Sequence, residues 1–102
     1  MFGQKSYWVY IMTNRKDGAL YIGVTSDLIR RVMQHRTGIV DGFSKQYRLK
    51  TLVYYEEGTD VFSVIQREKS LKTYPRQWKI NLINGFNPAW IDLYPKILGV
   101  TS

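Results

Sequence analysis

A chain of 102 residues, 44% of them hydrophobic, suits one compact domain, and we expect a single domain over residues 1–102. The absence of cysteine excludes disulfides, zinc–thiolate sites and a thiol nucleophile. The formal net charge of +7 is large for this size and favours a polyanionic partner.

A β-hairpin is predicted at the start of the chain. Tyr7–Met12 is an aromatic and β-branched run typical of a buried strand, and Leu20–Val24 resumes that character. Asn14–Gly18 between them is rich in turn-forming residues. If Tyr10 lies roughly opposite Tyr21, both hydroxyls project from one face of the hairpin, whereas a slip of one residue would separate them.

An amphipathic helix is predicted after the hairpin. Asp27 and the two hydroxyl residues before it supply N-cap oxygens, and the helix is expected to end near Arg36, before a Thr-Gly pair. At about 100° per residue, Arg31 and His35 fall on the same apolar arc as Val32. Side chains of these two types seldom point inward, so they are candidates for a functional site.

The rest of the chain supplies one more strand and two more helices. The segment 38–50 has no clean period and is expected to be a loop, and a third strand is expected at Leu52–Tyr55, ended by two glutamates and a glycine. A helix that Thr59 or Asp60 can cap is predicted through about Tyr74, before a proline, and another helix is predicted over Arg76–Ile83. The apolar, proline-marked tail, residues 86–97, is expected to pack back on the domain.

Glu68 is the most informative single residue. It falls in the middle of the apolar arc of the predicted second helix, where a carboxylate is costly unless it is paired or ligates a cation. An ion pair with Lys72, four residues later, explains it equally well, because such helical pairs are common.

Together, five residues point to phosphodiester chemistry, although each alone has an ordinary structural explanation. A carboxylate such as Glu68 can hold a divalent cation against a phosphate, and Arg31 can stabilise charge on phosphoryl oxygens. Tyr10, Tyr21 or His35 can take the proton from an attacking water. The chain has no P-loop, no zinc-ligand spacing and no serine-nucleophile motif.

Basic residues interleaved with aromatic ones are typical of surfaces that neutralise phosphates and stack bases. Charge alone is equally compatible with a solubilising surface. The candidate nucleic-acid-binding residues are Lys45, Arg48, Lys69, Lys72 and Arg76.

From about Tyr7 to Tyr94 the chain resembles the GIY-YIG nuclease family, specifically its small stand-alone bacterial members. The second signature triplet is intact as 21–23 (Y-I-G), whereas the first reads W-V-Y at 8–10 and keeps only its tyrosine. The steps of eleven residues from Tyr10 to Tyr21, ten to Arg31 and four to His35 also follow the family pattern.

The resemblance implies an α+β fold with a small three-stranded antiparallel sheet flanked by helices. It also implies hydrolysis of DNA phosphodiester bonds with one bound Mg²⁺ or Mn²⁺. Tyr10 would be the general base or would orient the water, Tyr21 would assist, and Arg31 would bind the scissile phosphate. His35 would support the tyrosines and the phosphate.

The resemblance assigns two later residues as well. Glu68, within R-E-K, matches the metal-binding glutamate, and Asn87, within N-P, matches a late asparagine that braces the site. Which of Tyr10, Tyr21 and His35 takes the proton stays open, as do the choice of metal and the oligomeric state.

Two functions follow from these observations. The first is a DNA endonuclease acting in repair or recombination. The alternative is a catalytically weak or inactive nucleic-acid binding module, or a subunit of a repair complex, because the first triplet is degenerate and the chain has no room for a separate targeting domain. A protein partner could then direct it to its substrate. With no apolar run near the roughly 18 residues of a membrane span and no signal-peptide core at its N-terminus, we expect a cytoplasmic protein that does not associate with membranes.

Overall fold

The computed structural model describes residues 5–40 and 42–99. Its strands β1 (Tyr7–Thr13), β2 (Leu20–Thr25) and β3 (Thr51–Gly58) form one antiparallel sheet in the order β2-β1-β3. The predicted α+β fold with a three-stranded antiparallel sheet is therefore confirmed. The third strand is longer than expected, because the two glutamates that were taken to end it continue the pairing with β1.

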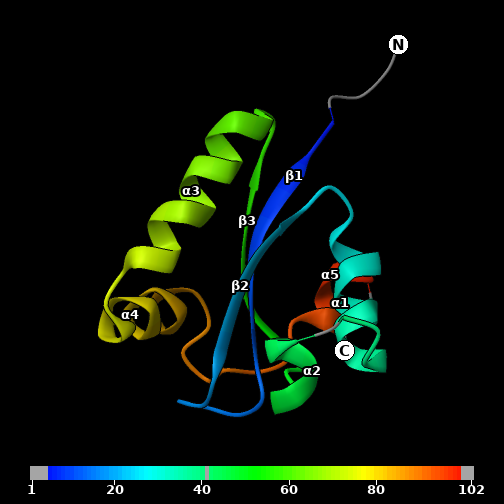
Figure 1. Ribbon diagram of the computed structural model, residues 1–102, viewed down its shortest axis with the longest axis vertical. Coiled ribbons are helices and arrows are strands. Elements are labelled where there is room, and N and C mark those ends of the chain that lie inside the picture. The colour runs from blue at the N-terminus through cyan, green and yellow to red at the C-terminus, as the bar shows by residue number, and fades with distance from the viewer. Residues whose placement is uncertain (1–4, 41, 100–102) are drawn as a thin grey trace.

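Helices cover both faces of this sheet (Figure 1): α3 and α4 lie on one side, and α1 and α5 on the other. The helices are α1 (Leu28–Thr37), α2 (Phe43–Tyr47), α3 (Val61–Thr73), α4 (Arg76–Phe86) and α5 (Tyr94–Ile97). The expectation of a loop over 38–50 was wrong, since α2 forms within it. No helix in the described part of the chain is long and apolar enough to cross a membrane.

The central strand β1 divides the interior into two cores. Val9 and Ile11 point to the α3–α4 side, whereas Tyr10 and Met12 point to the α1 side. Successive residues of a strand point to opposite faces of the sheet, and both faces of β1 are covered. Its residues are therefore apolar without interruption, as the sequence shows.

Local signals fix the ends of α1 and α3. The Asp27 carboxylate accepts a hydrogen bond from the backbone N–H of Arg30 (3.1 Å), and α1 ends at Gly38, whose φ of 77° lies in the left-handed region. Asp60 caps α3 by accepting from the N–H of Phe62 (3.2 Å). Both caps follow the sequence prediction, and they set which face of each helix meets the sheet.

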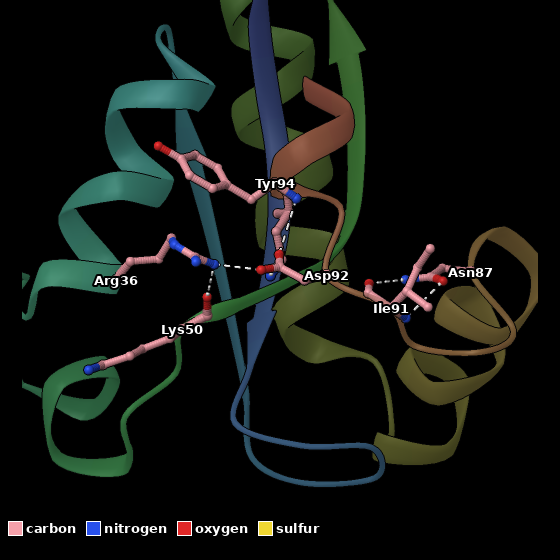
Figure 2. A network of polar contacts seen from close by, with 7 residues as sticks. Arg36, Lys50, Asn87, Ile91, Asp92 and Tyr94 are labelled. Carbon is pink, nitrogen blue, oxygen red and sulfur yellow. Dashed lines mark hydrogen bonds and ion pairs between the residues drawn. The ribbon is translucent and has the colours of Figure 1, made fainter. Parts of the chain in front are cut away.

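The tail packs back on the domain, as predicted, and one carboxylate joins it to two other elements (Figure 2). Asp92 accepts from the backbone N–H groups of Leu52 (3.2 Å) and Tyr94 (3.1 Å), and it forms an ion pair with Arg36 of α1 at 2.5 Å. The Arg36 guanidinium also lies over the Tyr94 ring, 4.7 Å from its centroid, and donates to the carbonyl of Lys50. We call this set of contacts the Asp92 junction.

A β-bulge in β3 explains why an amide side chain is buried near the tail. Ile11 lies opposite Tyr54 but Met12 lies opposite Leu52, so Val53 is an extra residue in the ladder. The Asn87 side chain donates to the carbonyl of Val53 at 3.2 Å, in place of a strand partner.

Candidate active site

A buried tyrosine hydroxyl is the centre of the candidate site. Tyr10 of β1 has no exposed surface, and its Oη lies 2.9 Å from Nε2 of His35 and 3.2 Å from Nε of Arg31, which donates to it. Arg31 and His35 are one turn apart on α1, the helix packed over this face of the sheet. The helix arc predicted from the sequence therefore brings both side chains to the same hydroxyl.

Tyr21 of β2 completes the cluster. Its ring centroid lies 4.9 Å from that of His35 and 6.2 Å from that of Tyr10. Tyr10 lies opposite Gly23 and Tyr21 opposite Met12, so the two tyrosines are offset by two residues. A shift of two residues leaves the side chains on the same face, so the tyrosines are diagonal neighbours rather than a direct pair.

Gly23 makes room for this arrangement. A Cβ built on Gly23 would lie 2.6 Å from the Tyr10 hydroxyl oxygen and 2.7 Å from the ring carbon that carries it. The Tyr10 ring thus lies over β2 at a position where only a glycine, which has no side chain, leaves enough space. Such close approach is one reason why a glycine occurs inside a strand. Gly23 belongs to the signature triplet, but its close approach to Tyr10 could not be predicted from the sequence.

Burial sets the protonation states of the cluster. Desolvation raises the pKa of Tyr10 well above its usual 10, although the Arg31 hydrogen bond opposes this. Desolvation, and then the charge of Arg31, lower the pKa of His35 to about 4. At neutral pH the imidazole is therefore uncharged, and its Nε2 shares a hydrogen bond with the Tyr10 hydroxyl, whose oxygen also accepts from Nε of Arg31.

Arg31 also borders a polar pocket of about 270 Å³, which we call the Arg31 pocket. Nη1 of Arg31 donates to Oε1 of Gln34 at 3.1 Å while its Nε donates to Tyr10, so the guanidinium is held in one orientation. The Tyr10 hydrogen bond raises the pKa of Arg31 further, which keeps the group charged. A fixed, charged guanidinium at the wall of a polar pocket is suited to binding a phosphate. The pocket is lined by Val24, Thr25, Ser26, Asp27, Arg30, Arg31 and Gln34.

Glu68 lies on α3, which packs on the opposite face of the sheet, and no hydrogen bond or ion pair within the described residues joins it to the cluster. Its carboxylate pairs with Lys72 at 3.1 Å, and its side chain is only 14% exposed. The alternative interpretation of Glu68, an i,i+4 ion pair, is thus observed. The neighbouring Arg67 is bound to Glu56 of β3 at 2.9 Å, which fixes this turn of α3 against the sheet.

The edge of β2 separates Glu68 from the cluster. A second pocket shares Val24, Thr25 and Ser26 with the Arg31 pocket but is otherwise lined from the α3 side, by Val61 and Ile65 among others. Glu68 follows Ile65 by three residues and Val61 by seven, so it belongs to the same helix face. Cavities therefore lie on both sides of the end of β2. One lies beside Arg31, and the other lies along the face of α3 that carries Val61, Ile65 and Glu68.

The donor set around Glu68 restricts the metal that this region could bind. No cluster of three or more His, Cys, Asp or Glu side chains occurs in 5–40 and 42–99. A single carboxylate suits Mg²⁺ or Mn²⁺ that keeps several waters and binds substrate phosphate, and it does not suit an ion that needs a full protein cage. Glu68 fits that limited role if its carboxylate releases the Lys72 ammonium group and binds the cation instead.

Asn87 lies away from the cluster, and its polar atoms have protein partners. Besides the carbonyl of Val53, its Nδ2 donates to the carbonyl of Ile91 at 2.8 Å, and its Oδ1 accepts from the N–H of Ile91 (Figure 2). This geometry holds the tail against the bulge of β3. The predicted bracing of the site by Asn87 would act through this tail, because no contact joins the two among the described residues.

The five basic candidates are not one patch. Lys45 lies on α2 and Arg48 directly after it, both exposed, whereas Lys69 and Lys72 are exposed on α3. Arg76, at the start of α4, donates to the carbonyls of Asp17 and Gly18 in the β1–β2 turn, at 2.7 and 2.6 Å. Arg76 therefore has a structural role that the sequence analysis missed.

Comparison with known proteins connects this site to a family. Residues 6–81 match the model of a family described as the GIY-YIG catalytic domain. A UPF0213 protein of Staphylococcus epidermidis is 38% identical over 77 residues, which are 76% of this chain and 93% of the relative. A UPF0213 protein of Staphylococcus saprophyticus is 35% identical over 78 residues, 76% of this chain and 94% of that relative.

The fold also has a solved counterpart. The solution NMR structure of the UPF0213 protein BH0048 from Bacillus halodurans matches with a TM-score of 0.52, covering 88% of this chain and 95% of that one. The sequence identity is 23%, so this likeness concerns the fold.

Proposed function

This chain belongs to the GIY-YIG family, a family of nucleases, and we propose that it is an endonuclease that hydrolyses DNA phosphodiester bonds with a divalent metal. One observation carries the proposal: Arg31, His35 and Tyr10 form a hydrogen-bonded cluster beside Tyr21, at the wall of a polar pocket. Repair or recombination of DNA is the process that this activity would serve.

Arg31 would bind the scissile phosphate. The guanidinium keeps its orientation through Tyr10 and Gln34, so binding an anion requires little rearrangement. A fixed positive charge beside the phosphate stabilises the negative charge that develops on its oxygens as the bond breaks.

Tyr21 is the group of this cluster that we assign to the attacking water. Tyr10 and His35 are buried, whereas Tyr21 is only half-buried. Tyr10 keeps its proton because its pKa is raised, and His35 is uncharged at neutral pH because its pKa is lowered to about 4. The His35 imidazole, held by Tyr10, packs against the Tyr21 ring and so fixes its position in the cluster.

Glu68 would hold Mg²⁺ or Mn²⁺ on the α3 side of the β2 edge. When bound, such a cation supplies Lewis-acid stabilisation of phosphate charge. The DNA strand would cross the edge of β2 to meet both Arg31 and Glu68, and the exposed lysines on α2 and α3 would neutralise flanking phosphates.

The experiment is a cleavage assay on supercoiled, single-stranded and branched DNA with Mg²⁺, Mn²⁺ or EDTA. Wild type is compared with Glu68→Gln and with the matched control Glu57→Gln, which changes an exposed glutamate of β3. We expect metal-dependent cutting that Glu68→Gln loses and Glu57→Gln retains, with all three proteins equally folded by thermal unfolding.

A second function is favoured by the Glu68–Lys72 ion pair, because a paired carboxylate has less tendency to bind a cation. In that case the domain binds nucleic acid, alone or as a subunit of a repair complex, and cuts poorly. Folded wild type that binds DNA but cuts none of the three substrates with either metal would establish this alternative over the nuclease.

A further inference from the structure

An apolar pocket of about 300 Å³ lies beside the cluster, on the same face of the sheet. We call it the Trp8 pocket. Trp8 is two residues before Tyr10 on β1, and Tyr55 lies opposite Tyr10 on β3, so both rings share the face of Tyr10. Leu28 and Ile29 of α1 close another side.

The Trp8 pocket adjoins the Arg31 pocket. Ser26 and Asp27, the residues that lead into α1, line both cavities. One cavity is polar and bordered by two arginines, and the other is apolar with two aromatic walls. A nucleotide has the same two parts side by side, an anionic phosphate and a flat base that stacks on aromatic rings.

We propose that the Trp8 pocket receives the unstacked base of the nucleotide next to the phosphate held at Arg31. This inference rests on the proposed function, and it narrows the substrate. A base inside a continuous duplex is stacked and paired and cannot enter, so the pocket selects DNA with an unpaired nucleotide at the cut, such as a flap, a loop or a frayed end.

The first test follows the tryptophan side chains directly, by NMR of the indole N–H groups in EDTA, where no cutting occurs. Trp8 is identified as the resonance that Trp8→Phe lacks. We expect it to shift on addition of a thymidine tetranucleotide and to stay in place with a tetramer of abasic deoxyribose phosphates. Trp90, which is buried and donates to Asn84, serves as the internal reference. No shift of Trp8 at millimolar tetranucleotide overturns the proposal.

The second test measures affinity for the same two ligands. We expect Trp8→Ala to weaken binding of the tetranucleotide by about 5- to 100-fold, the usual effect of losing one base–aromatic stack, and to leave the abasic tetramer unchanged. Phe62→Ala removes an aromatic ring that is 80% exposed on α3 and should change neither. Equal weakening of both ligands by Trp8→Ala overturns the base pocket. If Trp8→Ala does not fold, the wild-type NMR comparison decides alone.

Failure of this inference is distinguishable from failure of the proposed function. Cutting of flap and duplex DNA at equal rates, unaffected in Trp8→Ala and Phe62→Ala, would leave a nuclease without a base pocket. A Trp8 shift with the tetranucleotide, in a protein that cuts no DNA with either metal, would leave a base pocket in a binding module.

Discussion

The Tyr10 hydroxyl lies so close to Gly23 that a Cβ at position 23 would be 2.6 Å from the oxygen. We expect Gly23→Ala to displace the Tyr10 ring, because the three atoms nearest to the new Cβ all belong to the side chain of Tyr10, which is fully buried. The free energy of unfolding should fall by about 1–3 kcal/mol, the usual cost of overpacking. Cleavage should fall by about 100-fold, because the cluster loses its alignment. Urea denaturation and the cleavage assay measure the two effects.

Gly85 provides the matched control. It lies in α4 with no atom within 4 Å of a built Cβ, so Gly85→Ala should stabilise the protein by about 0.5–1 kcal/mol. If both substitutions had the same effect, the approach of Tyr10 to Gly23 would not be a rigid constraint.

Removing the Tyr10 hydroxyl tests the cluster without adding bulk. Tyr10→Phe leaves Nε of Arg31 and Nε2 of His35 without that partner, so we expect a loss of about 1–3 kcal/mol in the free energy of unfolding, together with reduced cleavage. Tyr7→Phe is the control, since the Tyr7 hydroxyl makes no hydrogen bond to the residues that the structure describes. An unchanged unfolding free energy in Tyr10→Phe would contradict the network.

His35 should make the stability depend on pH. Its pKa is about 4 in the folded protein and about 6.5 when unfolded. The unfolded chain therefore takes up the proton first as the pH falls, and stability that is complete above about pH 7 is lost between pH 6.5 and 4, by up to about 3 kcal/mol.

The window from pH 6.5 to 5 isolates this effect. The pKa of Glu56, a half-buried carboxylate, is lowered from 4.5, so the stability that Glu56 contributes is constant above that pH and is lost only below it. Urea denaturation across the window should show the slope in wild type and a flat line in His35→Gln. Because His35 is the only histidine, an NMR titration gives its pKa directly.

The Asp92 junction should couple the tail to α1. Asp92→Ala removes the acceptor for two backbone N–H groups and for Arg36, so we expect a loss of about 1–3 kcal/mol in the free energy of unfolding. In a double-mutant cycle with Arg36→Gln, the coupling energy should exceed about 0.5 kcal/mol. If the two substitutions lowered the free energy of unfolding additively, the Arg36–Asp92 ion pair would contribute no coupling energy, and each residue would act only through its other contacts.

DNA binding should weaken steeply with salt, because each phosphate contact releases condensed counterions. Lys45→Gln on α2 and Lys69→Gln on α3 each remove one exposed charge, and each should reduce the slope of log K against log salt by about 1 if its face contacts DNA. A slope that changes in one variant alone would assign the DNA to one side of the sheet. Binding that does not respond to salt would contradict a surface that follows the phosphate backbone.

The cluster could be predicted from the sequence because it depends on periodicity. Arg31 and His35 are four residues apart on one helix, and Tyr10 and Tyr21 sit on strands whose side chains alternate. The exact register between β1 and β2 was not needed for this prediction, because a shift of two residues leaves both tyrosine side chains on the same face of the sheet. The roles of these residues in catalysis stay predictions.

Contacts between distant parts of the chain could not be predicted in this way. Arg76 donates hydrogen bonds to backbone carbonyls 58 and 59 residues away in the sequence. Asn87 donates to the carbonyl of Val53, the extra residue of a β-bulge that no local sequence pattern predicts. Helix α2 has five residues, too few to show a period. For Glu68 the sequence offered an ion pair and a metal ligand; the structure shows the ion pair with Lys72, and the role as a metal ligand stays a prediction.

The attachment of the tail at Leu52 and Val53 has a consequence for association between molecules. Both outer strands of a three-stranded sheet expose backbone groups that can recruit another chain. The tail bonds to the N–H and carbonyl of Leu52 and to the carbonyl of Val53, so it blocks the start of β3 against strand addition. A version shortened at residue 81 would leave both borders of the sheet open, and such a molecule could stack with its neighbours into an open-ended polymer.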